Sequence, residues 1–228
     1  MSIHENAARV EERIERACRR AGRRRDEVKL IAVSKTFPSE RIREAYDAGL
    51  RDFGENRVQE AEGKISSLSD LEITWHLIGH LQSNKARRAR EIFHWVHSVD
   101  SARIAHKLDQ ALPEAEDRLP VLLQVNLAHE KTKFGVSGEE VASVAKEMGE
   151  LPAIELRGLM LIPPFFDDPQ DTRPFFRRLR GLANQIHSLR LRNVTMQELS
   201  MGMSHDFEIA IEEGATMVRV GTAIFGQR

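Results

Sequence analysis

Lys35 has the most distinctive chemistry in this sequence, because it follows the apolar run Leu30–Val33 and precedes an expected helix start. A strand that ends in a lysine places the amine at the mouth of its sheet. If that mouth is partly dry, the cost of burying an ammonium lowers the pKa of the lysine. The neutral amine would then be a nucleophile towards an aldehyde. A lysine at a strand end is more often a solvated edge charge, since functional amines with shifted pKa values are a minority.

Two segments near the end of the sequence have the composition of an anion site. Residues 200–206 include Ser204, which we expect to be the N-cap of the next helix with a free hydroxyl. Residues 218–223 include Gly221 and Thr222, which we expect to present backbone N–H groups and a hydroxyl at a second helix start. Two such corners facing one another would form a phosphate site without a lysine.

The elements that must position these residues follow from periodicity. Apolar residues at three- and four-residue steps predict a first helix from Ile3 to Ala21, which Gly22 closes. After it, short apolar runs alternate with helical patterns, as in α/β proteins. We expect strands at 29–34, 51–53, 74–79, 95–99, 121–126, 156–162, 196–201 and 216–220, and helices near 39–48, 56–66, 83–92, 101–112, 138–149, 173–190 and 204–213.

The number of strands favours one fold class. About eight strands in 228 residues predict a single (β/α)8 TIM barrel with an extra N-terminal helix, forming one domain over residues 1–228. A doubly wound open sheet is the main alternative, but no Gly-x-Gly-x-x-Gly motif follows the first strand. In a closed barrel the last strand neighbours the first, so Lys35 and the phosphate site would share one rim. Pyridoxal 5′-phosphate (PLP), an aldehyde joined to a phosphate through a small ring, would suit such a site.

Arg219 lies two residues before Gly221 and is expected to point towards the same mouth. Its guanidinium stays protonated at any ordinary pH. Placed against a pyridine nitrogen, it would keep that nitrogen unprotonated and make the ring a poor electron sink. The alternative is an ordinary arginine that pairs with a carboxylate such as Glu198, and position alone does not separate the two.

Several stretches resemble the pyridoxal phosphate homeostasis proteins, which are similar in fold to the barrel domain of alanine racemase. They follow the family in order along nearly the whole chain: Ala32–Thr36, Phe53–Asn56, His76–Gly79, Leu81–Lys85, Val125-Asn126, Arg157–Met160, Ser200–Ser204 and Met217–Gly226. The resemblance implies the barrel fold, PLP binding and a role in vitamin B6 homeostasis.

The resemblance also implies roles for single residues. Lys35 would carry PLP as an internal aldimine, and Arg219 would face the ring nitrogen. The other implied cofactor-binding residues are Asn56 at the ring, Ser204, Gly221 and Thr222 at the phosphate, and Ser200 and Met201 at the border of the phosphate site. PLP-dependent apoenzymes would be the recipients. Lys131 and Lys133 lie in a charged loop that matches the family loosely, and we expect them to be solvated.

A binding protein is expected rather than an enzyme. Racemisation by two bases needs a second proton carrier opposite the lysine. A tyrosine could be this proton carrier. Tyr46 is the only tyrosine, however, and its helical segment is expected to pack on the outside of the barrel. The alternative is a single-domain amino-acid racemase that uses His80 or His205 as a substitute base.

Composition excludes several other classes. Lys+Arg total 34 and Asp+Glu 35, so the net charge of −1 gives no signal for nucleic acid or membrane. A nucleic-acid module would need its arginine clusters to align on one face. Cys18 is the only cysteine, which excludes internal disulfides and cysteine-based zinc sites and favours the cytoplasm. No run approaches the ~18 apolar residues of a membrane span. We expect a monomer without a bound metal.

Overall fold

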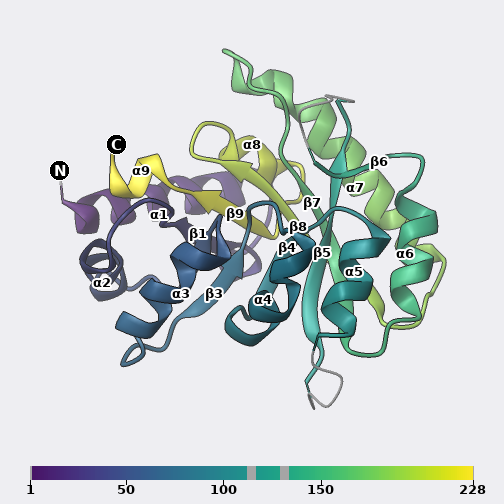
Figure 1. Ribbon diagram of the computed structural model, residues 1–228. Helices are drawn as coiled ribbons and strands as arrows, with labels where there is room; N and C mark the ends of the chain where they lie inside the picture. The colour runs from purple at the N-terminus through teal and green to yellow at the C-terminus, as the bar shows by residue number, and fades with distance from the viewer. Residues whose placement is uncertain (1, 112–116, 129–133, 228) are drawn as a thin grey trace.

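The computed structural model describes residues 2–111, 117–128 and 134–227, and in these ranges the strands close into a barrel (Figure 1). Its strands are β1 Lys29–Val33, β2 Asp52–Glu55, β3 Thr74–Leu77, β4 Trp95–Val99, β5 Leu119–Asn126, β7 Ile154–Leu161, β8 Val194–Met203 and β9 Met217–Val220. Each strand pairs in parallel with the next one in this order, including β4 with β5. The last strand, β9, pairs in parallel with β1, which closes the barrel. The predicted (β/α)8 barrel is confirmed, and the open sheet is wrong.

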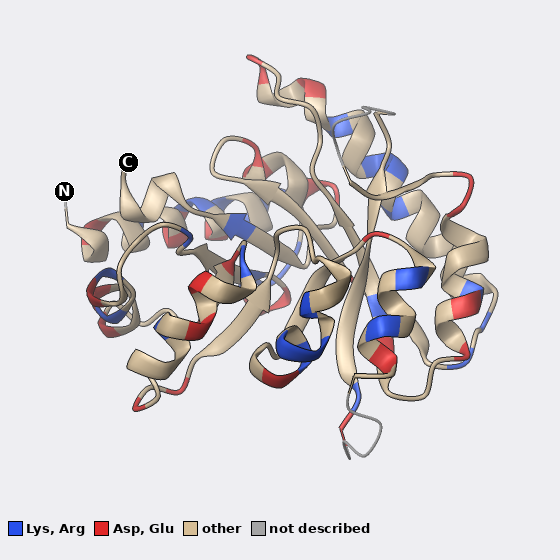
Figure 2. Ribbon diagram, viewed as in Figure 1, with Lys and Arg blue, Asp and Glu red and all other residues tan. Residues whose placement is uncertain are grey.

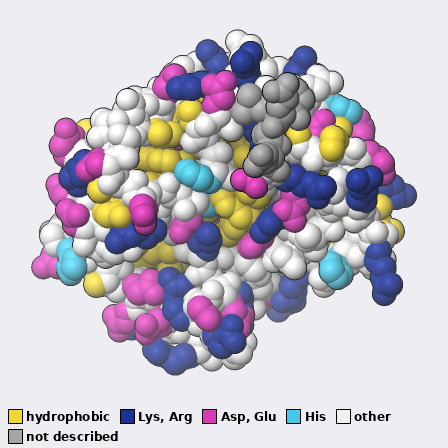
Figure 3. Space-filling view, turned by 90° about the horizontal axis from the view of Figure 1, so that it is seen from below, with side chains coloured by type: hydrophobic (Ala, Val, Ile, Leu, Met, Phe, Trp, Pro, Cys, Tyr) yellow, Lys and Arg dark blue, Asp and Glu magenta, His cyan; other side chains and the backbone are white. Residues whose placement is uncertain are grey.

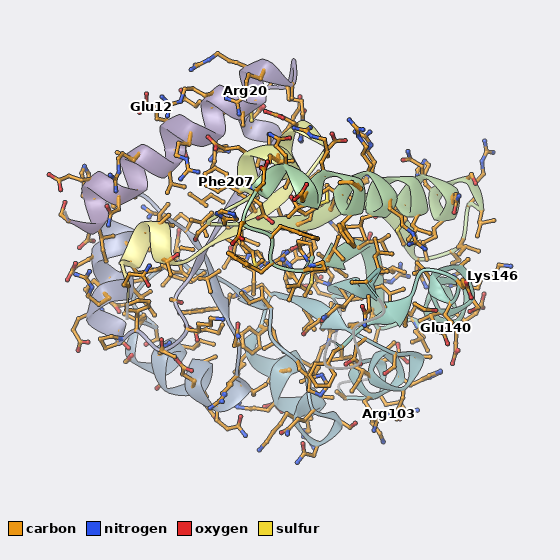
Figure 4. All side chains as sticks on the ribbon, turned by 90° about the horizontal axis from the view of Figure 1, so that it is seen from above. Glu12, Arg20, Arg103, Glu140, Lys146 and Phe207 are labelled. Carbon is orange, nitrogen blue, oxygen red and sulfur yellow. The ribbon has the colours of Figure 1, made fainter. Side chains whose placement is uncertain are left out.

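The helices surround the barrel, as the view from above shows (Figure 4). Their bounds are α1 Ile3–Arg20, α2 Ser39–Asp47, α3 Val58–Ser67, α4 Ala86–Ile92, α5 Ala102–Asp109, α6 Val141–Gly149, α7 Arg173–Ser188, α8 Phe207–Glu212 and α9 Thr222–Phe225. The short elements β6 Val136–Ser137, η1 Arg25–Glu27, η2 Ser83–Lys85 and η3 Pro169–Thr172 complete the described structure. Of these elements, β6, η1 and η3 were not predicted, because segments of two to four residues are too short to show a period. Helix α9 begins at Thr222, where the second helix start was expected.

The expected N-terminal helix, α1, is present and covers α8 and α9. Ser2 and Glu5 form a capping box at its start, which satisfies two backbone N–H groups. Its apolar stripe is buried, and Asn6 Nδ2 donates to the Ile224 carbonyl at 2.9 Å. Phe207 of α8 is fully buried beneath the Arg13 guanidinium, whose carbon lies 4.5 Å from the ring centroid. In Figure 4, Phe207 lies between α1 and the barrel.

Two predicted boundaries near the site were wrong by a few residues. Strand β2 extends to Glu55, beyond the expected end at residue 53. Helix α8 begins at Phe207 with Asp206 as its N-cap, so the expectation that Ser204 caps this helix is wrong. The reason is a turn after β8, in which Asp206 Oδ1 accepts a hydrogen bond from the Met203 N–H at 2.6 Å. Ser204 is left in the loop at the barrel mouth.

Both basic and acidic residues occur on the outer helices (Figure 2), and charged side chains of both signs occur around the rim of the face in Figure 3. Several arginines of the basic runs pair with carboxylates, such as Arg20 with Glu212 at 2.8 Å and Arg88 with Glu62 at 2.7 Å. Among the described helices, none has the length and apolar character needed to cross a membrane.

Candidate functional site

A cavity of about 540 Å³ opens where the strands end, at the carboxyl mouth of the barrel. We call it the C-terminal cavity. Six of the eight predicted site residues line it: Lys35, Asn56, Ser204, Arg219, Gly221 and Thr222. They follow or end four different strands, so parallel pairing gathers them at one rim, as expected for the active face of a TIM barrel.

Lys35 and Gly221 come together because β1 and β9 are neighbours. Ile31 is opposite Arg219 and Ala32 is opposite Val220 in this ladder. A Cβ atom built on Gly221 would lie 3.4 Å from Val33, at the very end of β1. The half-buried Lys35 therefore lies beside the corner that follows β9.

A buried charge network supports the turn that carries Lys35. Lys64 Nζ donates to the Ser34 carbonyl at 2.9 Å and to Glu55 Oε1 at 2.8 Å. It also donates to Glu60 Oε1 at 2.6 Å, and Glu60 accepts from the backbone N–H of Thr36. Burial raises the pKa of Glu55, against the opposing effect of its hydrogen bonds from Lys64 and Ser34. These contacts hold both residues that flank Lys35.

Thr36 has φ of 68°, a left-handed conformation that is uncommon for a β-branched residue. The Phe37 N–H donates to the Ser34 carbonyl at 3.1 Å, which closes a tight turn around Lys35 and Thr36. Such conformations persist only where surrounding contacts impose them, and they cluster at functional sites. The turn therefore orients the lysine at the cavity wall.

Arg219 is 4% exposed and lies in the wall of the C-terminal cavity. Its Nη1 donates to Ser200 Oγ at 2.6 Å and its Nη2 donates to the Leu161 carbonyl at 2.9 Å. Burial lowers the pKa of Arg219 to about 10, so the side chain remains protonated at neutral pH. Glu198, the alternative partner, instead accepts a hydrogen bond from Thr216 Oγ1 at 2.6 Å.

The corners after β8 and β9 are joined directly. The backbone N–H of Gly221 donates to Ser204 Oγ at 3.2 Å, and Thr222 lies beside them in the cavity wall. Gly202 has φ of 92°, and a Cβ atom there would lie 2.5 Å from the Cβ of Ala210. Only glycine therefore allows β8 to bend so closely over α8.

The two remaining predicted residues do not line the cavity. Ser200 is fully buried and bonds Arg219 from within the barrel, while Met201 is fully buried in the hydrophobic core. Side chains alternate along a strand, so Ser200 and Met201 point to opposite faces of β8. Both lie behind the wall rather than at the surface of the site.

Other cavity residues were missed because their roles depend on contacts across the barrel. Phe37, Gln124 and Ile162 line the cavity, and Gln124 Nε2 donates to the Phe134 carbonyl at 2.9 Å. A sequence signal existed for Gln124 alone, since a polar side chain within a buried strand usually faces an interior site or a bonded partner.

The alternative bases have partners of their own. His80 and His205 both line the cavity. His80 Nδ1 lies 2.9 Å from Asp100 Oδ2, and His205 Nε2 lies 3.1 Å from the Phe166 carbonyl. Tyr46 belongs to α2 and packs against the hydrophobic core outside the cavity lining, as expected.

Lys131 and Lys133 lie outside the described residues. Within the described part of the chain, no group of three or more His, Cys, Asp or Glu side chains is placed to hold a metal ion.

The family model and the relatives that match this sequence point to the same family. Residues 6–228 match the family described as alanine racemase, N-terminal domain. A pyridoxal phosphate homeostasis protein of Aquifex aeolicus is 46% identical over 228 residues, covering 100% of this chain and 99% of the relative. Another from Pseudomonas aeruginosa is 48% identical over 227 residues, covering 100% and 96%. These relatives are named as homeostasis proteins rather than as enzymes, in agreement with the expectation for this chain.

Solved structures agree in fold. PipY of Synechococcus elongatus with PLP bound has a TM-score of 0.86 and 41% identity, covering 99% of this chain and 100% of PipY. Alanine racemase of Corynebacterium glutamicum has a TM-score of 0.76 at 19% identity, and the match covers 61% of that enzyme. The second likeness concerns the fold alone. The chain therefore belongs to the alanine racemase N-terminal domain family and, within it, to the pyridoxal phosphate homeostasis proteins.

Proposed function

We propose that this protein binds PLP in the C-terminal cavity, holds it as a Schiff base on Lys35, and serves PLP homeostasis in the cytoplasm with little or no turnover. One observation carries the proposal: the pairing of β1 with β9 brings Lys35, Arg219 and the Gly221 corner into one cavity. The names of the relatives and the PLP-bound structure of PipY support it.

The cavity residues fit the three chemical parts of PLP. The cofactor supplies an aldehyde for an amine and an electron-withdrawing ring. Lys35 provides the amine, and the hydroxyls of Ser204 and Thr222 with the Gly221 backbone are suited to the phosphate. Asn56 would lie along the ring.

Arg219 provides the reason for low turnover. Its guanidinium remains charged at neutral pH, so a pyridine nitrogen that faces it would stay unprotonated. A ring in that state stabilises a carbanion poorly. The protein would then store PLP or hand it over, and we propose that it does so as a monomer, with PLP-dependent apoenzymes as recipients.

A second candidate function is amino-acid racemisation, because His80 and His205 lie in the cavity wall. Either imidazole would have to exchange a proton with a bound amino acid opposite Lys35. Both already contact other groups, Asp100 and the Phe166 carbonyl. Steady racemisation of an amino acid by the purified protein would favour this function over simple binding.

The test of the proposed function is covalent trapping. Purified protein incubated with PLP should absorb in the visible range, and the band should disappear on borohydride reduction. Mass spectrometry should then place the adduct on Lys35. The Lys35→Ala variant should lose the adduct and remain folded, because Lys35 ends a strand and is only half-buried.

The matched control is Lys146→Ala, which removes an exposed lysine of α6 that points outward in Figure 4. This variant should keep both the band and the adduct. A wild-type protein that stays colourless with added PLP would contradict the proposal. Loss of folding in Lys35→Ala would show that the lysine is structural instead.

A further inference from the structure

A chain of buried polar groups crosses the barrel beneath the C-terminal cavity, and the proposed PLP chemistry does not use it. His76 of β3 and His97 of β4 are fully buried, as is Ser200 of β8. His76 Nδ1 lies 3.0 Å from His97 Nε2, and His97 Nδ1 lies 2.8 Å from Ser200 Oγ. His76 Nε2 lies 2.8 Å from Asp52 Oδ1, at the start of β2.

The donor of each hydrogen bond in this series of buried groups follows from the Asp52 carboxylate when both imidazoles are neutral. A carboxylate only accepts hydrogen bonds, so His76 carries its proton on Nε2 and donates to Asp52 Oδ1. The Nδ1 of a neutral His76 then accepts, so His97 carries its proton on Nε2 and donates to it. The Nδ1 of a neutral His97 in turn accepts from the Ser200 hydroxyl, whose oxygen accepts from Arg219 Nη1. Every bond then runs in one direction, from Arg219 to Asp52.

Electrostatics favours the same protonation states. Burial lowers the pKa of His76, and it lowers the pKa of His97 well below the ordinary value, with further contributions from His76 and Arg219. Although burial opposes it, the hydrogen bond from His76 and the nearby Lys29 ammonium hold the pKa of Asp52 below its ordinary value. Two neutral imidazoles between a cation and an anion leave each ring nitrogen bonded.

Asp52, the last group of this hydrogen-bonded series, lies in a different cavity. Asp52 Oδ1 is 3.2 Å from Lys29 Nζ, and both residues line a hollow of about 450 Å³ that also includes Glu198 and Thr216. We call it the N-terminal cavity, because Lys29 and Asp52 begin their strands and Thr216 directly precedes β9. The bonded groups thus extend from one mouth of the barrel to the other.

We propose that Asp52, His76, His97 and Ser200 form a one-directional hydrogen-bond relay that positions the Arg219 guanidinium at the wall of the C-terminal cavity. Ser200 and the Leu161 carbonyl take two of the five N–H groups of Arg219, so the plane of the guanidinium is set from behind. The inference rests on the proposed function only for the identity of the ligand that Arg219 would face.

The first experiment needs no cofactor. Histidine ring ¹⁵N spectra of the protein without PLP should show protonated Nε2 and unprotonated Nδ1 in both His76 and His97, without titration between about pH 6 and about pH 8. His97→Gln and His76→Gln variants assign the signals. An Nδ1–H tautomer in either ring, or a charged imidazole in this range, would overturn the relay whether or not PLP binds.

The far end of the relay offers a matched pair of variants. Asp52→Asn keeps an oxygen that can accept from His76, so the tautomers should not change. Asp52→Ala removes the acceptor, and His76 and His97 should then show a mixture of tautomers or shifted Nε2 signals. Identical histidine spectra in both variants and in the wild type would contradict a connected relay.

The near end tests positioning of Arg219 through PLP binding. Ser200→Ala removes one acceptor of a charged donor and should weaken PLP binding about tenfold. Ser200→Thr keeps the hydroxyl and should restore most of the affinity if the extra methyl group is accommodated. Unchanged affinity in a folded Ser200→Ala variant would refute the positioning role. If the wild type fails to bind PLP, the proposed function fails, and the histidine tautomers still decide on the relay.

Discussion

The buried histidines should make the stability of this protein fall as the pH drops below about 6.5. Burial lowers the pKa of both His76 and His97 in the folded state, so the folded protein binds fewer protons than the unfolded chain in this range. The contribution of these histidines to the free energy of unfolding therefore rises with pH up to the pKa of histidine in the unfolded chain and is level above it. The loss begins where the unfolded histidines take up protons.

The size of the effect follows from this difference. Consider a histidine that stays neutral in the folded protein and has a pKa of about 6.5 in the unfolded chain. Each such histidine lowers the free energy of unfolding of the protein by about 2 kcal/mol between about pH 7 and about pH 5. His97 should show this full amount because its pKa is well below the ordinary value, and His76 adds a smaller share. Glu55 and Asp206, with pKa values raised by burial, act in the opposite direction as the pH falls.

Urea unfolding of the protein without PLP at the two pH values measures this loss. Comparing the wild type with His97→Gln isolates one imidazole, because the carboxylates are the same in both proteins. The variant should lose about 2 kcal/mol less than the wild type on acidification. Val96→Ala is the control, since it removes apolar volume from the same strand without a titratable group. An equal pH dependence in His97→Gln and the wild type would refute a buried neutral imidazole.

The remaining predictions concern packing and the charge network, and equilibrium unfolding with denaturant measures them all. A Cβ atom at Gly158 would lie 1.8 Å from the Glu198 carbonyl, so Gly158→Ala should force β7 and β8 apart and cost about 3 kcal/mol or more. Gly181→Ala, in α7 with open space around it, should instead stabilise by about 0.5–1 kcal/mol, and destabilisation there would contradict the packing argument. Lys64→Met leaves the Glu55 carboxylate buried without a cation and should cost about 3–5 kcal/mol. Adding Glu55→Gln should recover part of that loss, and no recovery would show that Lys64 acts mainly through other contacts.

The fold class and part of the site were predictable because they depend on local patterns. Apolar runs such as Leu30–Val33 alternate with amphipathic helical segments, and parallel β/α units must align their strand ends at one face. Once the strands close, a lysine after the first and a glycine corner after the last are neighbours. The resemblance to the family added residues such as Asn56, which also lies in the cavity wall.

The interior contacts were not predictable from the sequence, because they depend on the relative register of strands far apart in the chain. His97 and Ser200 are 103 positions apart, and their hydrogen bond exists only because of the stagger of the closed barrel. The pairings of β8 with both neighbours contain irregular register shifts, which no local period encodes. The sequence alone therefore determined which face of the barrel carries the amine, whereas tertiary structure decided that Ser200 supports Arg219 from behind and that two neutral imidazoles lie beneath it.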